Sequence, residues 1–464
     1  MPNCPFHQTK SIFEFDALNP AARENPWLYY DWLRKEESRR MYPLPHEKNF
    51  FMVHRFEDVK QVLSDPVTFS SKNIPTRKSL FFVLADGEEH KRIRTIISEV
   101  FAQRSLEQFE DLISEYIRNC TAALISAGNA ELFDTWADRI PLAVLSILFG
   151  MDTAVERLRE LHHDNIAINR ALFVTGGTGP RRNAQPSFSE KLSITFSLLG
   201  QTVQLVKLRR LLGADGMNEL LQMLIPEKGN HNIPRPDFSQ IPDGIGPMLK
   251  LLVAFAEKLK QTGDDNTVMP LLRNAISQKK ASLTEMMMAC TFIIFAGYET
   301  TSSLLSNCFV HLSRHPELFS RLKKHPEEID QFIDESLRFY TPVGRFLRKA
   351  TIDTELNGVQ IPKDSIILVM NGAANTDPDK FPAGCEFSLS RENASQHLSF
   401  GKGPHFCIGA PLALMQIKMA LHELISNASS ISIDESMPMK MVTDRDNGIL
   451  RYESIRINVH RKSG

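Results

Sequence analysis

One cysteine of the chain, Cys407, lies in a sequence that suits a metal ligand. Residues 400–409 read FGKGPHFCIG, and the apolar residues 411–425 that follow are expected to form a helix. The dipole and the N–H groups of a helix N-terminus stabilise a thiolate at this position. The glycines leave room for a flat, bulky group to approach the backbone. A thiolate that faces a planar cofactor predicts haem iron with Cys407 as its axial ligand.

Two other interpretations of Cys407 remain open on residue types alone. A buried cysteine without a metal packs as a small apolar side chain. A zinc site is the other alternative, because Cys385, His397 and His405 have side chains that bind zinc and could join Cys407. The zinc interpretation does not account for the glycines of residues 400–409.

A second candidate site interrupts a long apolar stretch. The capping-box pattern Ser282–Glu285 opens an apolar helix that is expected to reach about Arg314. A helix that is apolar on nearly all sides must be buried through the core. Glu299 and Thr300 lie within it, and a buried acid is unfavourable unless it is paired or functional. The structural alternatives are an ion pair for Glu299 and a hydrogen bond from the Thr300 hydroxyl to the Ala296 carbonyl.

The hydrophobic periodicity elsewhere predicts a mostly α-helical chain around these two sites. Further helices are expected at residues 26–36, 56–64, 89–100, 106–127, 136–149, 155–173 and 248–261. Short strands are expected at residues 50–54, 349–356, 359–362 and 365–370, with hairpin turns at Asn357-Gly358 and at residues 446–448. The Gly- and Pro-rich residues 175–180 and 226–247 are expected to be loops that bound a flap.

The composition narrows the class of protein. The chain has 464 residues and a net charge of −1, from 54 Lys and Arg against 55 Asp and Glu, which argues against a dedicated nucleic-acid binder. The 6 cysteines contain no CxxC pair, so we expect no disulfide framework and a reducing, cytoplasmic setting. The N-terminus lacks the apolar region of a signal peptide. No apolar run approaches the roughly 20 residues of a membrane span.

Residues 400–409 resemble the haem-binding loop of cytochromes P450, whose pattern F-G-x-G-x-H-x-C-x-G is matched at every fixed position. Further matches are residues 86–90 (DGEEH) with Arg94, residues 296–301 (AGYETT), residues 335–338 (ESLR), Arg348 and Arg391. The resemblance covers most of the chain. It implies a mainly α cytochrome P450 fold, with small β-sheets and a long central helix. It also implies a single domain over residues 1–464, with a smaller β-containing N-terminal part and no fused reductase.

The same resemblance implies roles for the matched residues. Thr300 and Glu299 are the expected catalytic pair, with Thr300 beside bound O₂ and Glu299 supplying protons. Glu335, Arg338 and Arg391 are expected to be structural, because they would tie their helix to the loop that carries Cys407. Removing one partner of such a buried set would leave a charge unpaired.

The expected cofactor and substrate contacts also follow from the family positions. The expected haem-binding residues, with Cys407 as the metal ligand, are His90, Arg94, Ala296, Arg348, Phe400, His405, Cys407 and Gly409. The expected substrate contacts are Phe82, Val83, Ile293, Val343, Phe346 and Ile449. Arg345 is left open between a haem propionate and the substrate.

The implied activity is that of a monooxygenase with haem b and O₂. It would hydroxylate or epoxidise an apolar small molecule, for which we favour a secondary-metabolite intermediate. Electrons would come from NAD(P)H through a separate ferredoxin or flavodoxin and its reductase. Candidates for a basic docking patch, or else ordinary solvated charges, are Lys402, Lys418, Arg92, Arg104, Lys323 and Lys324. The alternatives are a family member that catalyses coupling, desaturation or dehydration, and a non-catalytic haem-binding sensor. We expect a monomer with no nucleic-acid partner and no membrane span.

Overall fold

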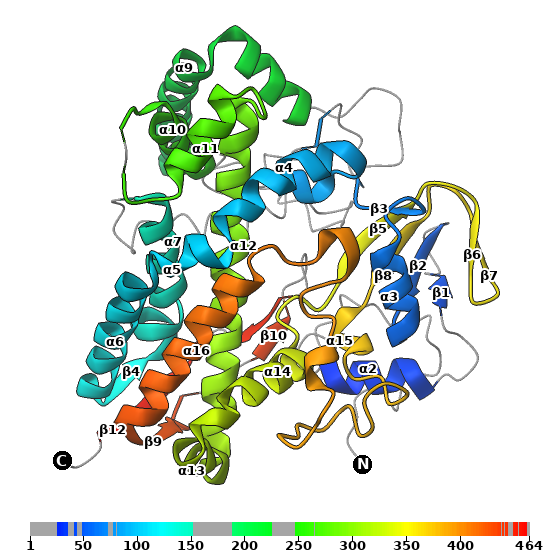
Figure 1. The fold of residues 1–464 in the computed structure, drawn as a ribbon, viewed down its shortest axis with the longest axis vertical. Coiled ribbons are helices and arrows are strands. Elements are labelled where there is room, and N and C mark those ends of the chain that lie inside the picture. The colour runs from blue at the N-terminus through cyan, green and yellow to red at the C-terminus, as the bar shows by residue number, and fades with distance from the viewer. Residues whose placement is uncertain are drawn as a thin grey trace. The chain divides into compact units, whose positions relative to one another are not determined.

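The structure is a computed structural model that describes residues 26–35, 41–43, 49–72, 78–79, 81–151, 188–224, 246–263, 265–437, 439, 441–443, 449–452 and 454–461 (Figure 1). The chain divides into two compact units, and each is described by itself. Unit 1 takes its residues from Met1–Asn73, Leu106–Val144 and Gly297–Gly464. Unit 2 takes its residues from Ile74–Ser105 and Leu145–Ala296.

The main sheet of unit 1 has five strands in the order β1-β2-β8-β5-β3. They are β1 (Met41–Pro43), β2 (Phe50–Val53), β3 (Phe69–Ser70), β5 (Phe346–Ala350) and β8 (Ile366–Val369). Strands β2 and β8 are parallel, whereas the other neighbours are antiparallel. Val53 and Ile367 of the sheet pack with Val59 and Leu63 of α3 (Phe56–Ser64) in an apolar core. The sheet therefore joins the N-terminal strands to the central part of the chain.

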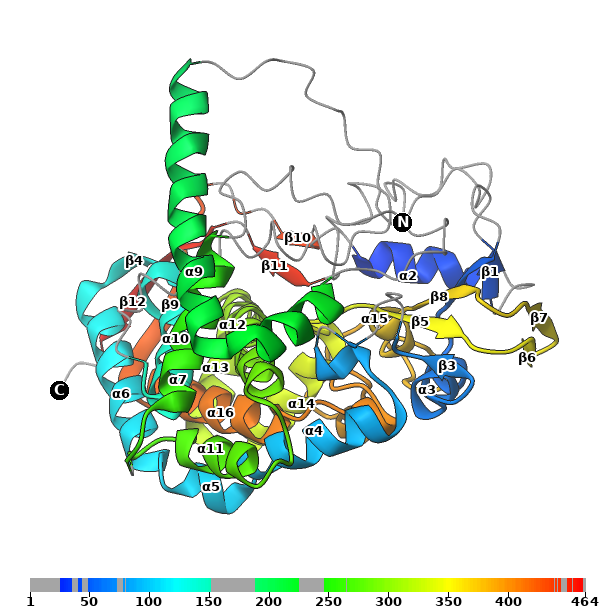
Figure 2. The same cartoon turned by 90° about the horizontal axis from the view of Figure 1, so that it is seen from above.

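Smaller sheets occur among the other described residues of unit 1. β4 (Asn129–Glu131), β12 (Arg456–Arg461) and β9 (Ala428–Ile433) form a three-stranded sheet, and β10 (Met441–Thr443) pairs with β11 (Leu450–Tyr452). β6 (Thr354–Leu356) and β7 (Val359–Ile361) form the predicted hairpin, with φ values of +50° at Asn357 and +81° at Gly358. Two consecutive positive φ values are typical of a type I′ turn. Figures 1 and 2 show this hairpin extending away from the main sheet.

Helices form much of the rest of unit 1. They are α2 (Pro26–Lys35), α3, α6 (Glu110–Ala127), α13 (Pro316–Lys324), α14 (Ile329–Tyr340), α15 (Asn371–Ala374) and α16 (Ala410–Asn427). Helix α16 packs against both α6 and α14, and Figure 1 shows it between them. The shorter helical turns are η3 (Phe133–Ala137), η5 (Pro326–Glu328), η6 (Ala394–Gln396) and η7 (Gly403–His405).

Unit 2 is built from η2 (Phe82–Leu84), α4 (Gly87–Val100), α9 (Phe188–Leu224), α10 (Gly246–Lys260) and α11 (Met269–Ser277). Helix α9 packs on α10 and is kinked at Gly213, where φ is +71°. A positive φ is favourable for glycine but strained for other residues. Figure 2 shows the two segments of α9 running in different directions.

Three helices have residues in both units, namely α5 (Gln103–Glu107), α7 (Arg139–Phe149) and α12 (Leu283–Arg314). The capping box predicted for α12 is confirmed: the Ser282 N–H donates to Glu285 at 2.8 Å and the Glu285 N–H donates to the Ser282 hydroxyl at 3.0 Å. These two bonds satisfy N–H groups that a helix start leaves without intrahelical partners.

The mainly α-helical prediction is confirmed, but several element boundaries were wrong. The strand predicted at residues 349–356 is two strands: β5 pairs with β3 and β8, while β6 pairs with β7. The helix predicted at 106–127 is broken, with α5 ending at Glu107 and α6 beginning at Glu110. The predicted helix 155–173, loop 175–180 and turn 446–448 lie outside the described residues, as does loop 226–247 up to residue 245. Among the described helices, none combines the length and apolar character that a membrane span requires.

Candidate active site

The segment Phe400–Gly409, here called the Cys loop, has a backbone held by its own hydrogen bonds. The Cys407 N–H donates to the Phe400 carbonyl at 2.8 Å, and the Phe406 N–H donates to the Gly403 carbonyl at 3.0 Å. Gly401 and Gly403 have φ values of +73° and +70°, which other residue types rarely adopt. The loop thus returns on itself and leads directly into α16, for which Gly409 is the N-cap.

Two glycines of the Cys loop serve different purposes. A Cβ on Gly403 would lie 2.8 Å from the Leu63 carbonyl oxygen, so only glycine allows the loop to pack against the end of α3. A Cβ on Gly409 would meet no heavy atom within 4 Å, so the backbone near the half-buried Cys407 borders open space. Cys407 thus places a thiol before a helix N-terminus, and a flat group can approach the backbone beside it. Both features fit the binding of a haem.

Aromatic side chains cover the Cys loop. The rings of Phe400 and Phe406 are 6.1 Å apart at an angle of 62°, and the His397 ring lies 5.7 Å from Phe400. Burial lowers the pKa of His397 to about 4, so this imidazole is neutral at physiological pH. His405 is half-buried in η7. Among the described residues, no three His, Cys, Asp or Glu side chains lie close enough together to bind a metal ion. This argues against the zinc alternative at Cys385, His397, His405 and Cys407.

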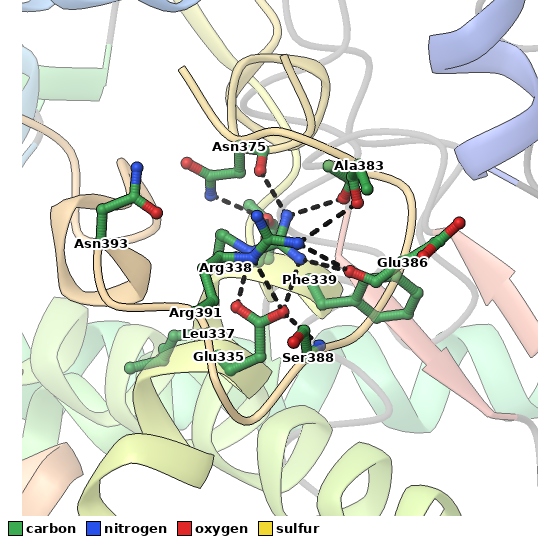
Figure 3. A network of polar contacts seen from close by, with 12 residues as sticks. Glu335, Leu337, Arg338, Phe339, Asn375, Ala383, Glu386, Ser388, Arg391 and Asn393 are labelled. Carbon is green, nitrogen blue, oxygen red and sulfur yellow. Dashed lines mark hydrogen bonds and ion pairs between the residues drawn. The ribbon is translucent and has the colours of Figure 1, made fainter. Parts of the chain in front are cut away.

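The predicted structural trio forms a buried network around Arg338 (Figure 3). The Arg338 guanidinium donates two hydrogen bonds of 2.7 Å to the Glu335 carboxylate, and neither side chain is exposed. Arg391 donates to the same carboxylate at 3.2 Å. The i, i+3 spacing on α14 places Glu335 and Arg338 on one helix face, as the sequence predicted. We call Glu335, Arg338 and Arg391 the Arg338 network.

The Arg338 network also binds the backbone of the segment that precedes the Cys loop. Arg338 donates to the carbonyl oxygens of Asn375 at 2.8 Å and Gly384 at 2.7 Å. Arg391 donates to the carbonyl oxygen of Pro382 at 2.7 Å. Because each N–H of the guanidinium can have its own acceptor, the buried charge is well compensated.

Asn375 connects the Arg338 network to the Cys loop, a role that the sequence analysis missed. Its amide oxygen accepts from the Leu398 N–H at 2.6 Å, and its amide nitrogen donates to the hydroxyls of Ser399 at 2.8 Å and Thr341 at 2.9 Å. The Ser399 hydroxyl in turn donates to the Leu337 carbonyl at 2.6 Å. Helix α14 is therefore tied to the two residues that directly precede Phe400.

The predicted catalytic residues lie near the middle of α12. Glu299 is buried and forms an ion pair with Arg451 of β11, with 3.5 Å between Oε1 and Nη1. Thr300, the next residue, is half-buried. The structural alternative for Glu299, an ion pair, is thus present. It does not exclude a catalytic role, because the partner side chain is 31% exposed and reaches solvent.

A second buried acid, Asp138, meets the same part of α12. The hydroxyls of Ser302 and Tyr298 both donate hydrogen bonds to its carboxylate. Burial raises the pKa of Asp138 to about 6, while these hydrogen bonds and the positive charge of Arg451 limit the rise. We call Glu299, Arg451, Asp138, Tyr298 and Ser302 the Glu299 cluster. The sequence analysis missed Arg451 and Asp138.

The two arginines at the start of β5, Arg345 and Arg348, are buried. Arg348 of β5 is buried, donates to the Leu347 carbonyl at 2.8 Å, and has its guanidinium 5.9 Å from the Phe346 ring. Arg345 is also buried, and its charge limits the rise in the pKa of Tyr30, which burial raises to about 12. Arg345 therefore has a structural neighbour in α2.

Two predicted substrate contacts meet in unit 1. Val343 and Ile449 form an antiparallel bridge, although they are distant in the chain. Ile449 is buried and Val343 is half-buried. The third, Phe346, packs against the apolar core of the main sheet.

The other predicted site residues belong to unit 2. The Phe82 ring lies 6.3 Å from the buried His90 ring at an angle of 15°, and 5.7 Å from Phe292 of α12. Arg94 is half-buried one turn after His90 on α4. Ile293 is buried, Val83 is half-buried and Ala296 is exposed. Phe292 is thus an aromatic neighbour that the sequence analysis did not single out.

Several cations of the predicted docking patch have partners within their own unit. Lys418 pairs with Asp330 at 2.7 Å in unit 1. In unit 2, Arg92 donates hydrogen bonds to both Glu285 oxygens, which lowers the pKa of Glu285. Lys402 is exposed at the Cys loop. The docking patch stays a prediction.

Comparisons with known proteins match the chain to one family. The family model described as "Cytochrome P450" matches residues 245–454. The chain is similar to "Putative cytochrome P450 YjiB" of Bacillus subtilis, with 26% identity over 87% of each chain. It is 24% identical to "Beta-dihydromenaquinone-9 omega-hydroxylase" of Mycobacterium tuberculosis, over 91% of this chain and 75% of that protein.

A solved structure shares the fold. It is CYP109E1 from Bacillus megaterium in complex with testosterone, with a TM-score of 0.71, 20% identity, and coverage of 94% of this chain and 98% of that one. The predicted cytochrome P450 fold is thereby confirmed. The family match, the relatives that cover most of its length and the shared fold together support the identification of the chain as a bacterial-type cytochrome P450, a family of haem-thiolate monooxygenases.

Proposed function

We propose that this protein uses O₂ and two externally supplied electrons to hydroxylate or epoxidise an apolar small molecule at a haem ligated by Cys407. The observation that carries the proposal is the Cys loop. Its cysteine is half-buried directly before the N-terminus of α16, and the backbone at Gly409 borders open space. For hydroxylation the balance is RH + O₂ + NAD(P)H + H⁺ → ROH + H₂O + NAD(P)⁺.

When bound, the thiolate-ligated haem b supplies O₂ activation, because the thiolate pushes electron density that favours O–O cleavage. The residues proposed to hold it, besides Cys407 as ligand, are Phe400, His405, Gly409, Arg348, His90, Arg94 and Ala296. Arg348 and His90 are buried donors, which suits charge-assisted hydrogen bonds to haem carboxylates. The protein's own contribution is to position the ligand, exclude water and deliver protons.

The proton-handling residues proposed are Glu299 and Thr300 on α12. A glutamate side chain that leaves its ion pair and takes up a proton from water can pass that proton to a hydroxyl one residue away. Arg451 connects Glu299 to solvent, since the guanidinium side chain is 31% exposed while the acid is buried. Thr300 would then relay the proton through its Oγ1 atom, giving up its own hydroxyl proton as it receives the one from Glu299.

The substrate class proposed is an apolar small molecule, such as a secondary-metabolite intermediate. Phe82, Ile293, Val343 and Ile449 are the apolar side chains assigned to contact it. Support comes from two relatives: one is named for the hydroxylation of a dihydromenaquinone, and another was solved with testosterone. The electron source proposed is NAD(P)H, through a separate ferredoxin or flavodoxin with its reductase.

The first test is the spectrum of the reduced, CO-bound protein. We expect the Soret band of a thiolate-ligated haem in the wild type and its loss in the Cys407→Ala variant. Cys385→Ala is the matched control, because Cys385 is an exposed cysteine outside the Cys loop and should not affect the band. Absence of haem in fresh wild-type protein, or an unchanged band in Cys407→Ala, would contradict the assignment.

The second test addresses the substrate and the reaction. Testosterone and dodecanoic acid serve as apolar probes, and binding should shift the spin state of the haem. Turnover under ¹⁸O₂ with a surrogate ferredoxin, its reductase and NADPH should add one labelled oxygen atom to the product. A product without added oxygen would instead indicate coupling, desaturation or dehydration, and haem binding without NADPH consumption would indicate a sensor.

A further inference from the structure

Arg451 is the positive charge that the two buried carboxylates of the Glu299 cluster have in common. It forms the 3.5 Å ion pair with Glu299, and its charge also acts on the carboxylate of Asp138. Glu299 and Ser302 are three residues apart on α12, so they share one helix face, and Ser302 donates to Asp138. Two acids therefore lie at the face of α12 that one guanidinium approaches.

The position of Arg451 is fixed by the strand that carries it. The Ser303 hydroxyl of α12 donates to the Leu450 carbonyl, and the Asn307 side-chain amide donates to the same oxygen at 3.3 Å. Strand β11 is thus anchored to α12 one residue before Arg451. Its side chain is the part of the cluster that reaches water, because Glu299, Asp138, Tyr298 and Ser302 are all buried.

We propose that Arg451 is shared between Glu299 and Asp138, and that Asp138 is a positioning residue whose negative charge frees Glu299 to leave Arg451. An ionised Asp138 offers the guanidinium a second anionic partner, so Glu299 can turn towards Thr300. When Asp138 is neutral, Glu299 is the remaining anionic partner of Arg451, so Glu299 stays in its ion pair. The proton-delivery role of Glu299 rests on the proposed function, whereas the sharing of Arg451 does not.

The surroundings of Asp138 place its change of charge near neutral pH. The titratable and charged groups that act on its pKa are Tyr298 of α12, Glu131 of β4 and Arg451 of β11. Burial, the largest effect, and the negative charge of Glu131 raise the pKa of Asp138, while hydrogen bonds from Ser302 and Tyr298 and the charge of Arg451 lower it. With the resulting pKa of about 6, a small change in pH alters the share of Arg451 that Glu299 receives.

Infrared titration of the holoenzyme tests the sharing without turnover. The band of a protonated carboxylic acid should disappear with a midpoint near pH 6 in the wild type and be missing in Asp138→Asn. In Arg451→Gln the midpoint should rise by about one pH unit or more, because the carboxylate loses a neighbouring positive charge. Arg451→Lys keeps the charge, so its midpoint should lie close to that of the wild type. Arg461→Gln, at the exposed end of β12, is the matched control and should leave the midpoint unchanged. A band that persists in Asp138→Asn, or an unshifted midpoint in Arg451→Gln, overturns the proposal.

Glu299→Gln distinguishes sharing from simple repulsion between the acids. If Arg451 is shared, removing the Glu299 charge leaves Asp138 as the anionic partner of the guanidinium. The midpoint of the Asp138 titration should then fall. The shift should vanish when Arg451→Gln is combined with it, because the coupling passes through Arg451. A shift of equal size in both backgrounds indicates direct repulsion and overturns the sharing.

Turnover then tests the consequence for proton delivery. The assay uses NADPH with a surrogate ferredoxin and reductase. Electrons that are not used to oxidise the substrate reduce O₂ to hydrogen peroxide, by O₂ + NADPH + H⁺ → H₂O₂ + NADP⁺. The peroxide fraction in the wild type should fall as the pH rises through about 6, whereas Asp138→Asn should give a high, pH-independent fraction. The same pH step in both proteins overturns the positioning role. A wild type that consumes no NADPH contradicts the proposed function, while the infrared result still decides the sharing.

Discussion

Two carboxylate–arginine clusters of unit 1 differ in how tightly their charges are held. In the Arg338 network the central pair is fully buried, and two parallel hydrogen bonds of 2.7 Å join its side chains. In the Glu299 cluster a single contact of 3.5 Å joins Glu299 to Arg451, whose side chain is 31% exposed. The first cluster is surrounded by backbone acceptors, whereas the second is surrounded by hydroxyls and another acid.

This difference separates a scaffold from a site that can change state. A buried pair with all its hydrogen bonds satisfied has no alternative partner of similar energy, so it holds one geometry. A longer pair, with one partly exposed member and a second acid nearby, can change partners at a small cost in energy. We therefore assign the first cluster to the placement of the Cys loop and the second to proton handling.

The largest effect is expected from breaking the buried pair. Glu335→Ala should leave the Arg338 charge uncompensated and lower the free energy of unfolding by about 3–5 kcal/mol. We expect the variant to lose haem rather than to react more slowly, because the loop that carries Cys407 loses its attachment. The haem-to-protein ratio and the thermal unfolding midpoint measure both effects.

Glu328→Ala is the matched control for this change. Glu328 also accepts two hydrogen bonds of 2.7 Å, from Arg321, but the Arg321 side chain is 50% exposed. Exposed pairs contribute about 0–1 kcal/mol, so this variant should keep its haem. Full haem occupancy in Glu335→Ala would show that the Arg338 network does not place the Cys loop.

A smaller effect is expected from cutting the connection between the Arg338 network and the Cys loop. Asn375→Ala removes the acceptor of the Leu398 N–H and the donor to Ser399 and Thr341, at a cost of about 2–4 kcal/mol. We expect haem to bind but a larger share of the CO complex to show the shorter-wavelength band of a lost thiolate ligand. Asn393→Ala, which loses one hydrogen bond to the Lys380 carbonyl, is the control. Equal CO spectra for the two variants would refute the connecting role of Asn375.

These clusters also show what the sequence could and could not predict. Glu335 and Arg338 are one helical turn apart, so local spacing and the family motif identify them together. Asp138 and Ser302 lie 164 residues apart, and their contact depends on how the turn between η3 and α7 packs on α12. A lone Asp or Arg at such a position resembles any surface charge until the fold is known.

The same reasoning applies to the elements. Helix α3 and the capping box of α12 were predicted correctly because propensity, periodicity and caps are local. The strand predicted at 349–356 was wrong because the pairing of β5 with β3 and β8, and of β6 with β7, is decided by distant partners. Asn375 carried no local signal, since its contacts with Leu398 and Ser399 depend on two loops meeting.

The smallest effect is expected from Asp138→Asn, and it depends on pH. The folded-state pKa of Asp138 is about 6, against 3.8 for the ordinary carboxyl, so between these values the folded protein binds more protons than the unfolded chain. The contribution of Asp138 to stability therefore falls as the pH rises through this window. Relative to Asp138→Asn, the wild type should lose about 1–3 kcal/mol between about pH 4 and pH 7.

The comparison must be made between variants, because buried histidines act in the opposite direction. Burial lowers the pKa of His311 to about 3 and that of His397 to about 4. Both histidines therefore lower the stability of the folded protein as the pH falls below 6.5, because the unfolded chain then binds more protons. This loss is common to the wild type and Asp138→Asn, and it cancels in the difference between their unfolding midpoints at each pH. A difference that stays constant from about pH 4 to pH 7 would mean that Asp138 does not titrate near pH 6. The Glu299 cluster would then be as fixed as the Arg338 network.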